Sequence, residues 1–117
     1  MGDLTANFSR SEFACKCGCG LDTIDYGTVY LCQRVRDFFE RRVTVTSGVR
    51  CLDHNASVGS TPASQHVHFR AADIVVEGID PKLVYEYLDD LGVPGLGSYA
   101  DFTHLDTRSG PKARWTG

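Results

Sequence analysis

Apolar residues recur at three- and four-residue steps between residues 28 and 42, and mostly charged residues lie between them. The apolar positions are Val29, Leu31, Cys32, Val35, Phe38 and Phe39. Because this spacing gathers them on one side of a helix, an amphipathic helix is predicted over residues 28–42. A second amphipathic helix is predicted over residues 82–91, where Asp80 and Pro81 suit the cap and first position and Gly92 suits the end.

Shorter β-branched and apolar runs predict the strands. They cover residues 43–46, 71–76, 95–99 and 102–106, and residues 113–115 are expected to add an edge strand. Ser9 and Glu12 form a capping-box pattern that suits one short helical turn. Residues 51–63 are expected to form a long connection that is either functional or flexible.

Size and charge narrow the classes of function. The chain has 117 residues, 42% hydrophobic and 23% charged, which fits one globular domain over residues 1–117. A net charge of −3 argues against a nucleic-acid partner, which usually needs a basic surface. No apolar run approaches the roughly 18 to 20 residues of a membrane span. Residues 1–5 lack the pattern of a secretory signal, so we expect synthesis in the cytoplasm.

Two histidines and one aspartate stand out as candidate metal ligands. His66 and Asp73 lie seven residues apart at the start of the predicted strand 71–76, and His104 lies in the predicted strand 102–106. Imidazole nitrogen and carboxylate oxygen are ligands that zinc takes. Three such ligands leave a fourth tetrahedral position for water, which is typical of a catalytic zinc site.

These residues have neighbours that resemble a known family. The matching motifs are Ser64-x-His66, Ala71-x-Asp73, His104-Leu105-Asp106 and Ser47-Gly48-Val49-Arg50. In this order they resemble the zinc D-alanyl-D-alanine carboxypeptidase family of peptidoglycan peptidases, most closely its short phage and prophage members. The resemblance runs from about Phe8 to Trp115. Phe69 departs from it, because the family usually has glycine there.

The resemblance implies a fold and an activity. The fold is expected to be α+β, of the hedgehog type, with a small, mostly antiparallel sheet and two main helices on one side. The implied activity is zinc-dependent hydrolysis of peptide bonds in peptidoglycan stem peptides, by a carboxypeptidase or an endopeptidase. His66, Asp73 and His104 are the implied zinc ligands. A protein without a signal would then reach the cell wall through a phage holin or on a virion.

The resemblance also suggests roles for other polar residues. Arg50 would stabilise negative charge on the attacked carbonyl, with a surface pair to Asp53 as the alternative. Ser64 would contact substrate. Asp101 and Asp106 compete as the general base: the family's acidic-x-x-His arrangement favours Asp101, whereas strand alternation puts Asp106 on the same side as His104.

Several alternatives stay open. His68, which alternates with His66 if the segment is extended, is a second candidate ligand. A bulky Phe69 would narrow the cleft or require an unusual backbone angle, so a catalytically degenerate metal-binding or virion structural module is one alternative. An interaction domain without metal is another. Tyr99 and Trp115 suit either the cleft or the core.

The five cysteines are at positions 15, 17, 19, 32 and 51. The run from Cys15 to Gly20 lacks the Cys-x-x-Cys spacing of most zinc ribbons. Free, partly buried thiols are therefore favoured over a structural metal, and a disulfide stays open.

Overall fold

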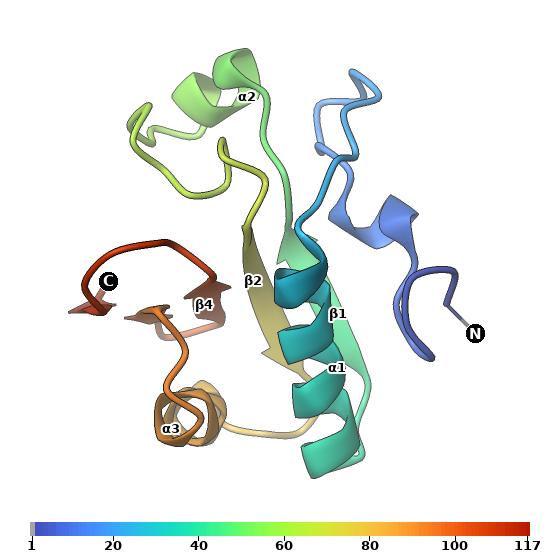
Figure 1. The fold of residues 1–117 in the computed structure, drawn as a ribbon, viewed down its shortest axis with the longest axis vertical. Helices are drawn as coiled ribbons and strands as arrows, with labels where there is room; N and C mark the ends of the chain where they lie inside the picture. The colour runs from blue at the N-terminus through green and yellow to red at the C-terminus, as the bar shows by residue number, and fades with distance from the viewer. Residues whose placement is uncertain (1) are drawn as a thin grey trace.

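A five-stranded sheet organises the chain, and its strand order is β1-β2-β4-β3-β5. The computed structural model describes residues 2–117 (Figure 1). The strands are β1 (Val43–Ser47), β2 (Ala71–Val76), β3 (Gly95–Ser98), β4 (Thr103–Asp106) and β5 (Ala113–Thr116). Neighbouring strands are antiparallel except β3 and β5, which are parallel. The expected α+β fold with a mostly antiparallel sheet is confirmed.

Two main helices pack against this sheet, and each begins at a side-chain cap. Helix α1 (Tyr26–Phe39) starts after Asp25, whose carboxylate accepts a hydrogen bond from the Thr28 backbone N–H. Helix α3 (Pro81–Asp90) starts after Asp80, which accepts from the Lys82 N–H. Both caps satisfy backbone donors that have no partner within the helix.

One face of the sheet packs into the hydrophobic core. The opposite face, which we call the free face, carries the polar residues of the candidate site. Residues alternate between the two faces along each strand. Ile74 of β2, Leu96 of β3 and Leu105 of β4 are buried in the hydrophobic core. Each such side chain contributes about 1.5 to 3 kcal/mol by leaving water. The alternate positions, including Asp73 and His104, therefore belong to the opposite face.

The structure corrects several predicted boundaries. Helix α1 begins two residues before the predicted start and ends at Phe39, because Glu40 takes a left-handed backbone conformation with φ 53°. The predicted connection 51–63 contains a short helix, α2 (Leu52–Ser57). The capping-box pattern of Ser9 and Glu12 is present, at the start of the 3-10 helix η1 (Arg10–Phe13).

His66 lies in a turn rather than in an extended segment, so strand alternation does not relate it to His68.

Among residues 2–117, no helix combines the length and apolar character needed to cross a membrane.

Candidate metal centre

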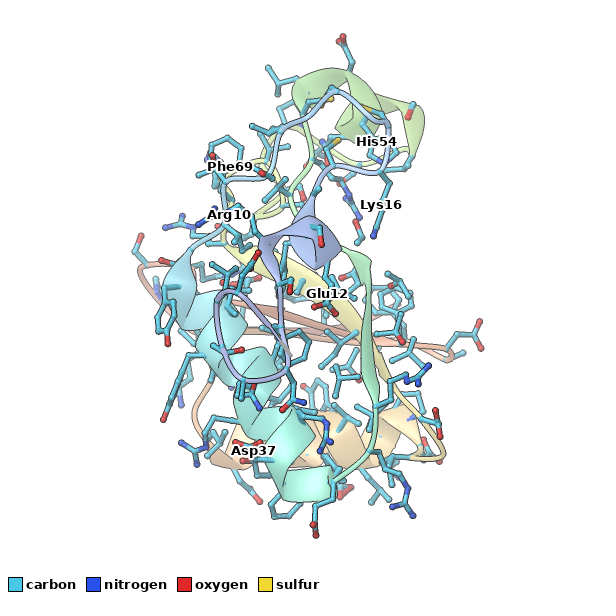
Figure 2. The ribbon with its side chains drawn as sticks, turned by 90° about the vertical axis from the view of Figure 1, so that its right-hand side faces the viewer. Arg10, Glu12, Lys16, Asp37, His54 and Phe69 are labelled. Carbon is cyan, nitrogen blue, oxygen red and sulfur yellow. The ribbon has the colours of Figure 1, made fainter. Side chains whose placement is uncertain are left out.

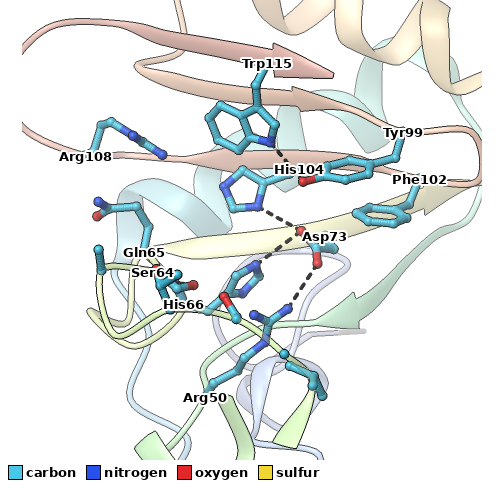
Figure 3. A pocket seen from close by; sticks show the side chains of 15 residues that line it. Arg50, Ser64, Gln65, His66, Asp73, Tyr99, Phe102, His104, Arg108 and Trp115 are labelled. Atoms are coloured by element: carbon cyan, nitrogen blue, oxygen red, sulfur yellow. Dashed lines mark hydrogen bonds and ion pairs between the residues drawn. The ribbon is translucent and has the colours of Figure 1, made fainter. Parts of the chain in front are cut away.

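Three predicted ligands come together on the free face of the sheet. Asp73 of β2 and His104 of β4 are directly paired across the antiparallel register, so their side chains leave the same face side by side. His66 reaches the same point from the turn before β2 (Figure 3). The Oδ1 atom of Asp73 lies 3.2 Å from His66 Nε2 and 2.9 Å from His104 Nδ1. All three residues are buried.

In each imidazole, the outer ring nitrogen, which points away from Asp73, has a hydrogen-bond acceptor as its partner. This partner determines the protonation of the inner nitrogen, which points toward Asp73. His66 Nδ1 lies 2.6 Å from the Gly48 carbonyl oxygen, and His104 Nε2 lies 2.7 Å from Asp106 Oδ2. Both partners are acceptors, so each outer nitrogen carries a proton and donates it. In neutral imidazoles the inner nitrogens then present lone pairs toward Asp73. Three acceptor atoms facing one another call for a cation between them.

The spacing of these atoms fits a small divalent cation. The three ligand atoms all lie within 4.8 Å of one another. Zinc bonds of about 2.0 to 2.2 Å to nitrogen and oxygen place neighbouring tetrahedral ligand atoms about 3.4 Å apart. Shifts of a few tenths of an ångström would open the present contacts to that spacing. The residues therefore fit zinc by ligand type, lone-pair direction and distance.

The same contacts shift the ionisation of the metal-free protein. Burial opposes charge on Asp73, but hydrogen bonds from His104 and His66 lower the pKa of its carboxyl well below the ordinary range. Burial also opposes charge on His104, yet its hydrogen bonds to Asp106 and Asp73 raise the pKa of this imidazole. Without metal, a proton on His104 thus partly offsets the negative charge of Asp73. This proton lies at the position where a metal ion would bind.

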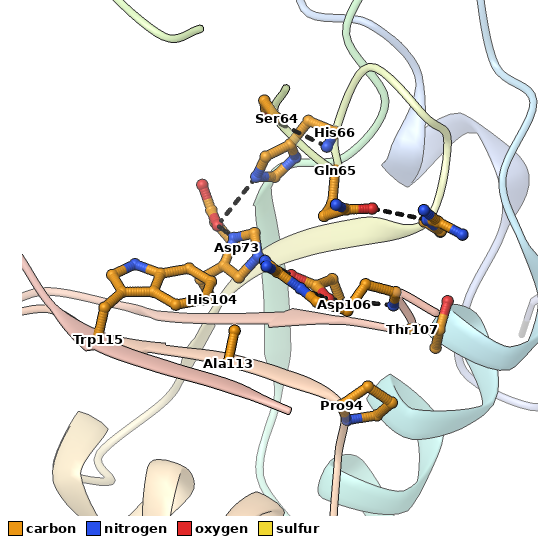
Figure 4. Close-up of polar contacts among 12 residues, drawn as sticks. Ser64, Gln65, His66, Asp73, Pro94, His104, Asp106, Thr107, Ala113 and Trp115 are labelled. Atoms are coloured by element: carbon orange, nitrogen blue, oxygen red, sulfur yellow. Dashed lines mark hydrogen bonds and ion pairs between the residues drawn. The ribbon is translucent and has the colours of Figure 1, made fainter. Parts of the chain in front are cut away.

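Asp106 lies beside His104 (Figure 4) and links this imidazole to Arg108 through hydrogen bonds to both side chains. Its Oδ2 accepts from His104 Nε2 and, at 2.7 Å, from Arg108 Nη2, while its Oδ1 accepts from Arg108 Nε at 2.8 Å. Against the cost of burial, Arg108 and His104 lower the pKa of the Asp106 carboxyl. Asp106 is 0% exposed, and both of its oxygens are engaged. It therefore orients the imidazole, as carboxylates behind ligating histidines commonly do.

Arg50 lies on the other side of Asp73, held by three groups. Its Nη2 lies 3.5 Å from Asp73 Oδ2, its Nε donates to Ser47 Oγ at 3.1 Å and its Nη1 donates to Asn55 Oδ1 at 3.3 Å. Asn55 is itself fixed by donating to the Thr61 carbonyl. The guanidinium is thus held at the centre, and its carboxylate partner is Asp73 rather than Asp53.

These groups open into a pocket of about 410 Å³. Arg50, Ser64 and the three candidate ligands line it, together with aromatic side chains (Figure 3). The aromatic side chains are Tyr99, Phe102 and Trp115. The Trp115 ring lies 5.0 Å from that of His104, and its Nε1–H donates to the Tyr99 hydroxyl. Tyr99 and Trp115 therefore belong to the cleft, and the pocket has the size of a small-ligand site.

Three other sequence-based candidates lie outside this lining. Asp101 is exposed in the bend before β4, and His68 is exposed in the turn. Phe69 does not narrow the cleft, because its side chain is not part of the pocket wall. The expected backbone consequence is present, however: Phe69 has φ 63°, a left-handed conformation that costs a side chain with a β-carbon about 1 to 2 kcal/mol.

Sequence reasoning missed Arg108, which follows Asp106 by two residues, and the two glycines of β3. A β-carbon at Gly95 would collide with the Asp106 carboxylate, and one at Gly97 would collide with Trp115 and Tyr99. Alternate glycines within a predicted strand were the available signal, since glycine inside a strand often marks close approach of another group.

Two imidazoles and one carboxylate, with an arginine beside them in an open pocket, form a candidate metal centre whose ligand types are those of catalytic zinc sites. The chain belongs to the Peptidase M15 family, whose family model matches residues 6–106. Members of this family are zinc-dependent metallopeptidases. No curated protein matches the chain.

Proposed function

We propose that this protein is a zinc peptidase that hydrolyses peptide bonds in bacterial peptidoglycan stem peptides, as a carboxypeptidase or an endopeptidase. The observation that carries the proposal is the convergence of two imidazole lone pairs and the Asp73 carboxylate beside Arg50. Membership in a metallopeptidase family supports the same chemistry.

His66, Asp73 and His104 would hold the zinc ion. When bound there, zinc supplies a Lewis acid and lowers the pKa of a water ligand toward neutrality. Asp106 keeps the His104 ring in place, and Gly48 does the same for His66. The ligands are thus fixed before metal arrives, which keeps the reorganisation cost low.

Arg50 is the group that meets the substrate carbonyl in this proposal. Its guanidinium lines the pocket and stays charged at all working pH values. It would stabilise the negative charge that develops on the carbonyl oxygen, an effect worth roughly 3 to 4 kcal/mol for one lost donor. Tyr99, Trp115 and Ser64 supply further parts of the wall against which a peptide can lie.

Asp101 is our proposed general base. Asp106 has both oxygens engaged by His104 and Arg108, so it has no free lone pair directed at the pocket. Asp101 is exposed and directly precedes Phe102, which lines the pocket. An inward turn of this bend on substrate binding would bring the carboxylate to the reacting atoms.

The proposed setting is a phage lysis enzyme or a virion-associated enzyme. The substrate is in the cell wall, and the protein would reach it by holin-dependent release or on a virion. Release into medium after co-expression with a holin, compared with expression alone, tests this setting separately from the chemistry.

The direct test measures new amino groups released from purified peptidoglycan by the wild type, His66→Ala and His68→Ala. His68 is an exposed histidine outside the pocket and serves as the matched control. We expect release by the wild type and His68→Ala and none by His66→Ala. Synthetic stem peptides then separate the activities, because a carboxypeptidase releases terminal D-alanine and an endopeptidase exposes an internal amine.

Zinc at the His/Asp centre without release from any substrate would contradict the peptidase proposal and favour a degenerate metal-binding module. Absence of zinc from this centre would favour an interaction domain. Equal loss of release in His66→Ala and His68→Ala would show that the His66 effect is not specific to the centre.

A further inference from the structure

Four of the five cysteines gather in a second cluster, away from the centre described above. Cys15, Cys17 and Cys19 lie in the loop between η1 and α1, and Cys51 lies just before α2. Their sulfur atoms all lie within 4.8 Å of one another. Lys16 and His54, which belong to these two segments, are labelled at the same end of the molecule in Figure 2. The fifth cysteine, Cys32, is 0% exposed in the core.

The sulfur spacings match the edges of a tetrahedron around zinc. Zinc–sulfur bonds of about 2.3 Å place neighbouring thiolates about 3.8 Å apart. The observed distances are 3.4 Å for Cys15–Cys17, 3.8 Å for Cys15–Cys51 and 3.7 Å for Cys17–Cys51. A disulfide needs about 2.05 Å. These three sulfurs thus stand at the separation of ligands that share one ion, and Cys19 Sγ lies within 4.8 Å of each of them.

Backbone geometry holds the sulfurs in this arrangement. The Cys15 N–H donates to the Leu21 carbonyl at 2.8 Å and closes the loop. Gly18 and Gly20 have φ 83° and 91°, so the chain can turn between the cysteines without strain. The Cys51 N–H donates to Cys15 Sγ at 3.5 Å, which favours the charged thiolate that a metal requires.

The loop has few other sources of stability. Residues 16–20 are all exposed, and the segment from 14 to 25 contains no helix or strand. A loop of this length with little buried apolar surface gains most from a cross-link to a distant part of the chain. We propose that Cys15, Cys17, Cys19 and Cys51 together bind one structural zinc ion, as a closed four-thiolate site without an open position.

This second zinc would hold the first site in place. Cys51 directly follows Arg50, and the Val49 N–H donates to the Phe13 carbonyl at 2.8 Å. A β-carbon at Gly48 would collide with the Phe13 backbone, so the two segments are in close contact. The thiol cluster therefore joins the N-terminal loop to the segment that supplies Arg50 and the carbonyl partner of His66.

The test uses the full chain, purified under argon, in four forms: wild type, His66→Ala, Cys17→Ser and Cys32→Ala. His66→Ala disables the His/Asp centre, and Cys32→Ala removes the one thiol outside the cluster. We expect one zinc per chain in His66→Ala, with X-ray absorption showing only sulfur ligands at about 2.3 Å. Cys17 is exposed, so Cys17→Ser should fold and lose this zinc, whereas Cys32→Ala should keep it.

Cobalt substitution gives a second measurement that does not depend on peptidase activity. Wild-type and His66→Ala proteins should show a thiolate-to-cobalt charge-transfer band, and Cys17→Ser should lose most of its intensity. Zinc-free His66→Ala, a sulfur-free zinc shell, or a disulfide among the four cysteines in the argon-purified protein would each overturn the proposal. Loss of peptidase activity alone would not bear on it, because the sulfur-bound zinc is measured directly.

Discussion

Replacing Asp106 with asparagine separates positioning from proton transfer. The substitution keeps the shape and one acceptor oxygen but removes the charge that faces His104 and Arg108. Loss of a carboxylate behind a metal-bound histidine typically weakens metal binding about 10- to 100-fold. That range equals about 1.4 to 2.7 kcal/mol. We therefore expect the zinc dissociation constant of Asp106→Asn to rise by this factor.

Competition with a fluorescent zinc chelator measures this constant, and kcat is then measured at saturating zinc. Asp101→Asn is the matched control, because Asp101 is an exposed aspartate near the same strand. It should bind zinc normally and lose about 10²- to 10⁴-fold in kcat, the usual contribution of a general base. Unchanged zinc affinity in Asp106→Asn, with such a loss of kcat, would refute the reasoning and make Asp106 the base.

Three further predictions follow from backbone strain, titration and close packing. Phe69→Gly should raise the free energy of unfolding by up to about 1 kcal/mol, because relief of the left-handed backbone strain exceeds the entropy that glycine adds to the unfolded chain. Urea unfolding measures this change, and peptide turnover should stay the same. Without zinc, stability should fall as the pH drops below about 4, because unfolding returns the lowered pKa of Asp106 to its ordinary value and the unfolded chain then binds the proton more readily. It should fall again as the pH rises above about 6.5, because the unfolded chain then gives up the proton that the raised pKa of His104 retains in the folded protein. Thermal melts of the zinc-loaded protein should lack the alkaline loss, and the same loss in both forms would contradict this origin. Gly97→Ala should lower the free energy of unfolding by about 1 to 3 kcal/mol, because the added β-carbon would collide with the Trp115 ring. It should also shift the fluorescence of Trp115, the single tryptophan, whereas an unchanged spectrum would show that the indole had not moved.

The elements of this fold were largely predictable from local patterns. The helix over 82–91 differs from α3 by one residue at each end, and the strand over 71–76 coincides with β2, because each has strong periodicity or β-branched content and clear end signals. Helix α2 was not predicted, since its six residues are too few to show a helical period. The parallel pairing of β5 with β3 depends on the path of the chain, which no local pattern encodes.

For the candidate site too, sequence motifs indicated the residues, but only the folded chain shows their geometry. Motif order brought His66, Asp73 and His104 to attention, and the structure places their ligand atoms together. Their metal role stays a prediction. The direction of each lone pair could not be read from sequence, because it depends on the Gly48 carbonyl, 18 residues before His66. Likewise, the approach of Cys51 to Cys15 spans 36 residues and needs the folded chain.

The direct pairing of Asp73 with His104 across β2 and β4 also bears on how the chain folds. A slip of one residue between these strands would turn the imidazole toward the hydrophobic core and leave the carboxylate without it. Only one strand alignment can therefore assemble all three ligands. A metal ion that binds during folding would stabilise that strand alignment relative to the alignments shifted by one residue. The centre would therefore help to select the correct register of the sheet that carries it.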